Sequence, residues 1–204
     1  ETFTASDTFS RVVSSGWGAA ESGGVWAPAG GSASVLSVVD GAGRFDLATG
    51  ATREILLQGT SVRDSISKIT YTMTQGPASG AAYVGLGMRY TSAGSYQAVA
   101  WHRNDGSTWL LLRRAGNLLG SVPLPGLSWS AGSTFHVAAE ATGSSPTTIR
   151  AKVWADGAAE PASWQLTTTD STDGFQTAGT PSVFHYRAGT GAVSSPVLVD
   201  NFTL

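Results

Sequence analysis

The fold of this chain is decided by one stretch, Tyr83-Val84-Gly85-Leu86-Gly87-Met88-Arg89-Tyr90, in which two kinds of residue alternate. Successive side chains of a β-strand point to opposite faces, so a period of two predicts a strand. In this stretch Val84, Leu86 and Met88 would face a core. The other side carries small, aromatic and basic residues, and we expect it to face away from that core.

The same alternation recurs along the whole chain, for example at residues 67–74, 135–140, 148–154, 183–187 and 196–204. Turn-forming segments rich in Gly, Asn, Asp and Pro separate these runs. No stretch of a dozen residues shows the 3.6-residue period of an amphipathic helix. The pattern therefore predicts an all-β sandwich or barrel of about twelve strands.

Length and composition exclude several classes of protein. The chain has 204 residues, which fits one domain spanning 1–204. Its net charge of −2 and pI of 5.9 argue against nucleic acid as a partner. No run of 18 apolar residues exists, so we expect no membrane insertion. Because the sequence contains no Cys, it excludes disulfides, redox thiols and cysteine-based zinc sites.

The beginning of the sequence suggests a larger parent protein. The chain starts at Glu1, without Met and without the basic and apolar segments of a signal peptide. We therefore expect a processed or excised part of a longer, multidomain chain.

The strand sides opposite the predicted core indicate a ligand surface. In the strand around residues 96–102, we expect the side with Gln97, Val99 and Trp101 to be buried. In the strand at residues 135–140, we expect the side with Val137 to be buried. The opposite sides mix Gly and Ala with aromatic and hydrogen-bonding groups, a combination suited to sugars, which have flat apolar patches and many hydroxyls. The predicted contact residues are Arg89, Tyr96, His102, Arg150, Lys152 and Trp154. The alternative is an ordinary solvated sheet face.

Two further sequence features concern tryptophans. Trp154 is the preferred candidate for stacking on a sugar, because Arg150 and Lys152 share its side of the strand. The segment Glu160-Pro161-Ala162-Ser163-Trp164 predicts a structural loop, with Trp164 as its anchor.

Motifs for catalysis are missing from the sequence. A glycosidase needs two carboxyl groups at a fixed separation, and none of the five Glu lies in a Glu-x-Asp-x-Glu array. The sequence has no Gly-x-Ser-x-Gly motif, and its three His lie far apart. These observations predict that the protein is not an enzyme.

The two ends of the sequence suggest a calcium site. Asp7-Thr8-Phe9 near the start is echoed by Asp200-Asn201-Phe202 near the end. Chain termini often lie close together, and paired terminal strands would bring Asp7 and Asp200 near each other. Carboxylates and loop carbonyls are ligands that Ca²⁺ prefers. Alternatively, each Asp caps a turn or points into solvent.

Several segments together resemble a known family. These segments are Asp7–Arg11, Gly16-Trp17-Gly18, Gly24-Val25-Trp26, Ser145–Trp154, Gly157–Trp164 and Val199–Phe202. The set is similar to laminin-G-like, concanavalin A-like modules of actinobacterial secreted proteins and of minor tail proteins of their phages. This resemblance implies a jelly-roll sandwich of two antiparallel sheets. It also implies a glycan-binding concave face and a common Ca²⁺ site.

Three functions follow from these observations as hypotheses. The first is a lectin-like, non-catalytic module of an extracellular bacterial protein that binds a poly- or oligosaccharide on the concave sheet. The second is a structural or host-adhesion domain of a phage tail or capsid, located in the virion. The third is a polysaccharide lyase or hydrolase that uses His102, Tyr96 and Arg89 as an acid–base set.

Overall fold

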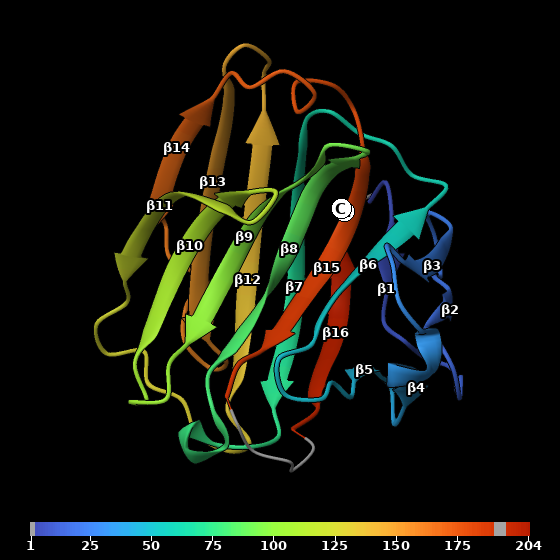
Figure 1. Ribbon diagram of the computed structural model, residues 1–204, viewed down its shortest axis with the longest axis vertical. Helices are drawn as coiled ribbons and strands as arrows, with labels where there is room; N and C mark the ends of the chain where they lie inside the picture. Colours follow the sequence, from blue (N-terminus) through green and yellow to red (C-terminus); the bar gives the residue numbers. More distant parts are fainter. Residues whose placement is uncertain (1–2, 190–194) are drawn as a thin grey trace.

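The chain forms two antiparallel β-sheets packed face to face (Figure 1). The computed structural model describes residues 3–189 and 195–204. Over these residues, helical structure is limited to the 3₁₀ turns η1 (Ala33–Val35) and η2 (Pro77–Ser79). No helix in these ranges is long and apolar enough to cross a membrane. The predicted all-β jelly-roll sandwich is confirmed.

Sheet A, the rear layer in Figure 1, has the strand order β14-β13-β12-β7-β16-β5-β4, with β1 paired to β16. Its strands are β1 (Ser6–Asp7), β4 (Leu36–Val39), β5 (Ala42–Phe45), β7 (Ser65–Met73), β12 (Thr134–Thr142), β13 (Thr147–Ala155), β14 (Leu166–Asp170) and β16 (Val197–Thr203).

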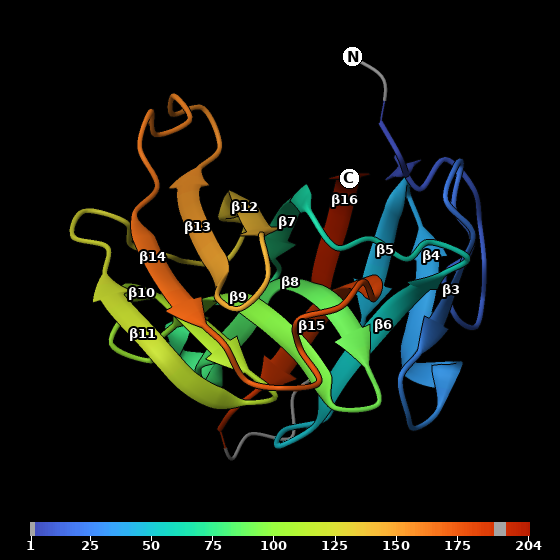
Figure 2. The same ribbon diagram turned by 90° about the horizontal axis from the view of Figure 1, so that it is seen from above.

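Sheet B has the order β11-β10-β9-β8-β15-β6-β3-β2. Its strands are β2 (Gly18–Ala19), β3 (Val25–Pro28), β6 (Thr52–Gln58), β8 (Ala82–Thr91), β9 (Gly94–His102), β10 (Thr108–Arg114), β11 (Asn117–Pro123) and β15 (Thr180–Arg187). Seen from above, sheets A and B form two separate layers (Figure 2).

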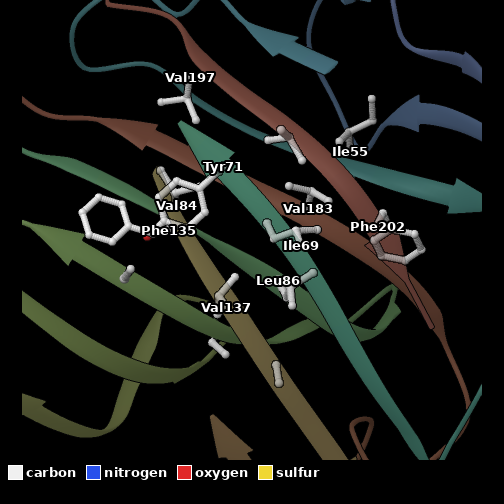
Figure 3. Close-up of a cluster of buried hydrophobic side chains, with 14 of the residues drawn as sticks. Ile55, Ile69, Tyr71, Val84, Leu86, Phe135, Val137, Val183, Val197 and Phe202 are labelled. Carbon is white, nitrogen blue, oxygen red and sulfur yellow. The ribbon is translucent and has the colours of Figure 1, made fainter. Parts of the chain in front are cut away.

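The core lies between the two sheets, where alternate residues of each strand meet (Figure 3). Val84 and Leu86 of β8 in sheet B are fully buried, as are Val137 of β12 and Ile69 of β7 in sheet A. Burying one such side chain contributes about 1.5–3 kcal/mol. The alternation that predicted the β8 strand therefore also identified its buried side correctly.

Strand β9 has the opposite orientation from the predicted one. Ala98 and Ala100 face the core, whereas Gln97 and Trp101 lie on the outer side of sheet B. The cause is the pairing register, in which Ala98 lies opposite Leu86 and residues directly opposite each other share a face. In β9 both sides contain apolar residues, so alternation could not show which side is buried.

Candidate functional site

Four aromatic side chains form a row across the outer face of sheet B. Trp109 of β10 lies opposite Trp101 of β9, Trp101 lies opposite Tyr83 of β8, and Tyr83 lies opposite Tyr186 of β15. Each of four adjacent strands thus contributes one ring at the same register. We call these four residues the aromatic row. Rings in such a row offer apolar surfaces against which a sugar can pack.

The rings of the aromatic row contact one another and two arginines. Trp101 and Tyr83 stack with centroids 5.4 Å apart and an interplanar angle of 12°. The Tyr83 and Tyr186 centroids are 5.3 Å apart. The guanidinium carbon of Arg103 lies 5.0 Å from the Trp101 centroid, and that of Arg113 lies 5.0 Å from the Tyr83 centroid. The row therefore combines apolar surface with two positive charges.

Next to the aromatic row the floor of the face is made of glycine. Gly85 and Gly87 are buried in β8. A Cβ atom at Gly85 would collide with the backbone carbonyl of Ala98. A Cβ at Gly87 would collide with the Ser182 hydroxyl and lie 2.5 Å from Glu54 Oε1. Only glycine permits these close approaches, and atoms of Ala98, Ser182 and Glu54 fill the space above Gly85 and Gly87, whereas the sequence analysis expected small residues to leave room for a ligand.

A single carboxylate lies over the glycine floor and is held by three neutral donors. Ser95 Oγ and Ser182 Oγ each donate to Glu54 Oε1 at 2.6 Å, and Gln97 Nε2 donates to Oε2 at 3.2 Å. These donors come from β9 and β15, while Glu54 comes from β6. The carboxylate is therefore fixed in position by side chains of two other strands.

Glu54 also lines a hollow of about 330 Å³ at the side of the face. The other lining residues are Ala29, Gly30, Thr52, Arg53 and Phe184. Strand β3 ends at Pro28, which leaves the neighbouring part of β6 without a partner strand. The hollow is therefore a consequence of the early end of β3.

Tyr83 is a partly buried, titratable member of the aromatic row. Burial raises the pKa of Tyr83, while the positive charge of Arg113 acts in the opposite direction. The phenol therefore keeps its proton at neutral pH and can donate it.

Two of the predicted contact residues lie inside the core and cannot contact a ligand on an open face. Tyr96 is fully buried, and its hydroxyl donates to Asp170 Oδ2 at 2.8 Å. Burial, followed by the bond to Asp170, raises the pKa of Tyr96 to about 12. His102 is also fully buried, bonded to the Tyr71 hydroxyl at 2.7 Å and to Thr108 Oγ1 at 3.1 Å. The reversed orientation of β9 explains both positions.

Arg89 is buried at one end of the sandwich, 1% exposed, rather than on a sheet face. Its guanidinium donates to the Arg63 carbonyl at 2.5 Å, the Gly143 carbonyl at 2.8 Å and Thr147 Oγ1 at 2.7 Å. It also forms an ion pair with Asp64 at 3.3 Å. These bonds join the start of β7 to the turn before β13, so Arg89 serves the packing of the sheets.

The other three predicted contact residues lie on the outer face of sheet A. Trp154 stacks on His136 with centroids 5.1 Å apart. Lys152 donates to the Pro161 carbonyl at 2.7 Å and pairs with Glu160 at 2.9 Å. Arg150 and Lys152 both lie over the ring of Trp164. The loop around Pro161 thus covers Arg150 and Lys152, with Trp164 as the expected anchor, whereas Trp154 is half-buried and lines a hollow of about 550 Å³.

The six predicted contact residues therefore do not share one face. The face that carries the site contains Trp101, Trp109, Arg113 and Glu54, none of which the sequence analysis selected. Gly85 and Gly87 were the available signal on this face, but the strand pairing decides which side chains lie beside them. That pairing was not available from the sequence pattern.

Asp7 and Asp200 do not fit a calcium site. The terminal strands pair as predicted, with Asp7 opposite Phe202. The Asp7 carboxylate accepts two bonds from Arg11 at 2.7 Å, one from Trp26 Nε1 at 2.7 Å and one from the Phe9 amide. These donors take the places of a cation, whereas Ca²⁺ needs six or more oxygen ligands. Residues 3–189 and 195–204 contain no cluster of three or more His, Cys, Asp or Glu able to hold a metal.

The structure is similar to carbohydrate-active proteins of known structure. A mutant of the alginate lyase Aly36B, solved in complex with alginate trisaccharide, matches with a TM-score of 0.64 and 15% identity over 98% of both chains. The Bacillus licheniformis β-glucanase matches with a TM-score of 0.64 and 12% identity over the full length of both chains. A carbohydrate-binding module, CBM66 from Bacillus subtilis, matches with a TM-score of 0.56 and 13% identity over 87% of this chain and 93% of the module.

The fold is a jelly-roll β-sandwich of the concanavalin A-like kind. At these identities the similarity shows the fold alone. No protein-family model and no curated protein matches the sequence. The laminin-G-like and phage-tail assignments remain predictions.

The prediction that the protein is not an enzyme is wrong. It depended on the missing Glu-x-Asp-x-Glu array, which is one arrangement of catalytic groups among several. Structures that match along nearly the whole chain include an alginate lyase and glucanases, so this fold is one that enzymes share.

Proposed function

We propose that the protein binds an acidic polysaccharide on the outer face of sheet B and cleaves it. The observation that carries the proposal is the aromatic row with Arg113 beside Tyr83 and the glycine floor next to it. Sugar rings would pack on the row, and Arg113 would bind an acidic group through its planar fork of donors.

The side chains on this face favour β-elimination over hydrolysis. Among the side chains described above for this face, Glu54 is the one carboxylate, and hydrolysis of a glycoside uses two. In an elimination, the proton next to the sugar carboxyl group leaves, the glycosidic C–O bond breaks and a C=C bond forms. Arg113 would stabilise the charge that develops on the carboxyl group. Tyr186, in its phenolate form, would take this proton, and the adjacent Tyr83 phenol would protonate the leaving oxygen. Proton exchange with solvent would then return both groups to their starting forms.

The test compares three variants on gels containing alginate, polygalacturonate or hyaluronan, and on the same polymers in solution. We expect Trp101→Ala to lose retention and product release together, because the ring is a binding platform. Tyr83→Phe keeps the ring but removes the proton, so it should keep retention and lower the release of unsaturated sugar ends by about 10²-fold or more. Ultraviolet absorbance of the new C=C bond measures release.

Trp154→Ala is the matched control, since it removes a similar ring from the outer face of sheet A. We expect wild-type retention and release from this variant. If Trp154→Ala abolishes retention while Trp101→Ala does not, the site lies on sheet A and the proposal is wrong. Failure of the wild-type protein to bind or cleave any of these polymers would also contradict it.

The proposed substrate is consistent with a protein that acts outside the cell, where acidic polysaccharides occur as matrix and surface polymers. An extracellular location is therefore part of the proposal. The structures that match the fold include proteins bound to alginate oligosaccharides, which supports a polysaccharide as the partner.

A further inference from the structure

We propose that Glu54 selects a sugar unit without an acidic group, so that the preferred polymer alternates acidic and non-acidic units. This inference rests on the proposed function and concerns the same face. It is carried by the position of Glu54 relative to Arg113, Tyr83 and the hollow at the side of the face.

Glu54 lies on the binding face with its charge unmatched by its partners. Its three donors are two hydroxyls and an amide, all of which are neutral. Other carboxylates of the protein are paired with cations, for example Asp7 with Arg11 and Glu160 with Lys68. Glu54 therefore presents negative potential to whatever lies beside it on this face.

The negative charge and the positive charge reach the outer face from strands on opposite sides of β8, Glu54 from β6 and Arg113 from β10. The Glu54 carboxylate lies over Gly87, and the Arg113 guanidinium lies over the ring of Tyr83, both on β8. Because β9, β8 and β15 lie between β10 and β6, and neighbouring strands are about 4.8 Å apart, the Arg113 and Glu54 backbones are roughly 19 Å apart across the sheet. Different units of one polymer therefore meet charges of opposite sign.

This arrangement discriminates between polymers. An acidic group beside Arg113 gains a charge-assisted interaction, whereas an acidic group beside Glu54 is repelled. A non-acidic sugar at Glu54 instead donates its hydroxyl hydrogens to the carboxylate. The hollow of about 330 Å³ next to Glu54 supplies the ring of Phe184 as an apolar wall for such a unit.

The experiment measures the affinity of wild-type protein, Glu54→Gln and Glu160→Gln for size-matched oligosaccharides. The probes are polygalacturonate fragments, in which every unit is acidic, and hyaluronan fragments, in which acidic units alternate with uncharged ones. Glutamine keeps the size of the side chain and removes its charge. Glu160→Gln removes the same charge from the loop over sheet A and measures the general effect of net charge on polyanion binding.

We expect wild-type protein to bind hyaluronan fragments more tightly. Glu54→Gln should gain about tenfold in affinity for polygalacturonate with little change for hyaluronan, and Glu160→Gln should change both alike. The inference is overturned if Glu54→Gln shifts both affinities equally or neither. A wild-type protein that binds neither probe, with Trp101→Ala indistinguishable from it on every polymer, would overturn the proposed function together with this inference.

Discussion

At the scale of single residues, the core holds two histidines that must remain neutral. His102 bonds to Tyr71 and Thr108, and His185 Nδ1 lies 3.0 Å from the Tyr83 carbonyl. Burial lowers the pKa of His102 from 6.5 to about 3 and that of His185 to about 4. Each therefore accepts a proton more readily in the unfolded chain than in the folded protein.

Because these histidines are protonated more readily in the unfolded chain, we expect the protein to lose stability in acid. The folded state binds fewer protons, so their destabilising effect is absent above pH 6.5 and grows as the pH falls toward 4. Each histidine should lower the free energy of unfolding by about 1.4 kcal/mol per pH unit in this window. Urea unfolding between pH 4.5 and 7.5 measures the slope.

The variant His102→Gln separates this effect from the titration of carboxyl groups. It removes one titrating group while leaving a side chain that can bond to the Tyr71 hydroxyl. The slope of stability against pH should fall by about 1.4 kcal/mol per pH unit. An unchanged slope would show that His102 does not contribute to acid unfolding.

At the scale of elements, the short strand β1 is held by a buried charge. Asp7 is fully buried, and its bonds to Arg11 and Trp26 join β1 to the segment before β2 and to β3. The ring of Trp26 also packs against Phe202 of β16, with centroids 5.0 Å apart. One carboxylate thus connects the start of the chain to both sheets.

Asp7→Asn should destabilise the protein by about 3 kcal/mol. The amide cannot accept all four bonds, and the Arg11 charge loses its partner. Asp156→Asn is the control, because Asp156 is 63% exposed and its pair with His136 contributes less than about 1 kcal/mol. Chemical denaturation of both variants provides the measurement, and equal losses would contradict the role of Asp7.

The elements also show which strands were predictable. In β8 and β12 one side is clearly more apolar, so alternation identified the buried face correctly. In β9 the bulkier Trp101 lies on the outer face and Ala98 faces the core. The reason is that Ala98 is paired opposite Leu86, and Leu86 faces the core. Hydrophobicity alone ranks Trp101 as buried, and only the pairing with β8 corrects this.

At the scale of the whole molecule, one core includes residues from both ends of the chain. Phe9, Leu110 and Phe202 belong to the same buried cluster, so neither sheet has a core of its own. We therefore expect the chain to unfold as one domain, in a single cooperative transition.

This expectation is tested by thermal or urea unfolding followed with two probes. Far-ultraviolet circular dichroism reports the sheets, and tryptophan fluorescence reports Trp17 and Trp26 near the terminal strands as well as Trp101 and Trp109 on the outer face. The two midpoints should coincide. Separate transitions would show that the chain contains two independently folding units.

The sequence by itself determined the class of fold and the residues that form strands. A period of two, turn residues between the runs and the lack of helical periodicity leave an all-β sandwich or barrel as the outcome, because strand geometry is local. The pairing of the terminal strands was also expected, because chain termini often lie close together. The sequence also places Gly85 and Gly87 on the same side of one strand, because the alternation of side chains along a strand is local.

Only the tertiary structure decided which strand sides form the site. Arg150, Lys152 and Trp154 look like Arg113, Trp101 and Trp109 in their local sequence, yet the loop with Pro161 and Trp164 covers Arg150 and Lys152. The strand order β10-β9-β8-β15-β6 in sheet B assembles the second set with Glu54 from β6. Strand register and loop coverage depend on contacts between residues far apart in sequence, and these are set by packing of the whole molecule.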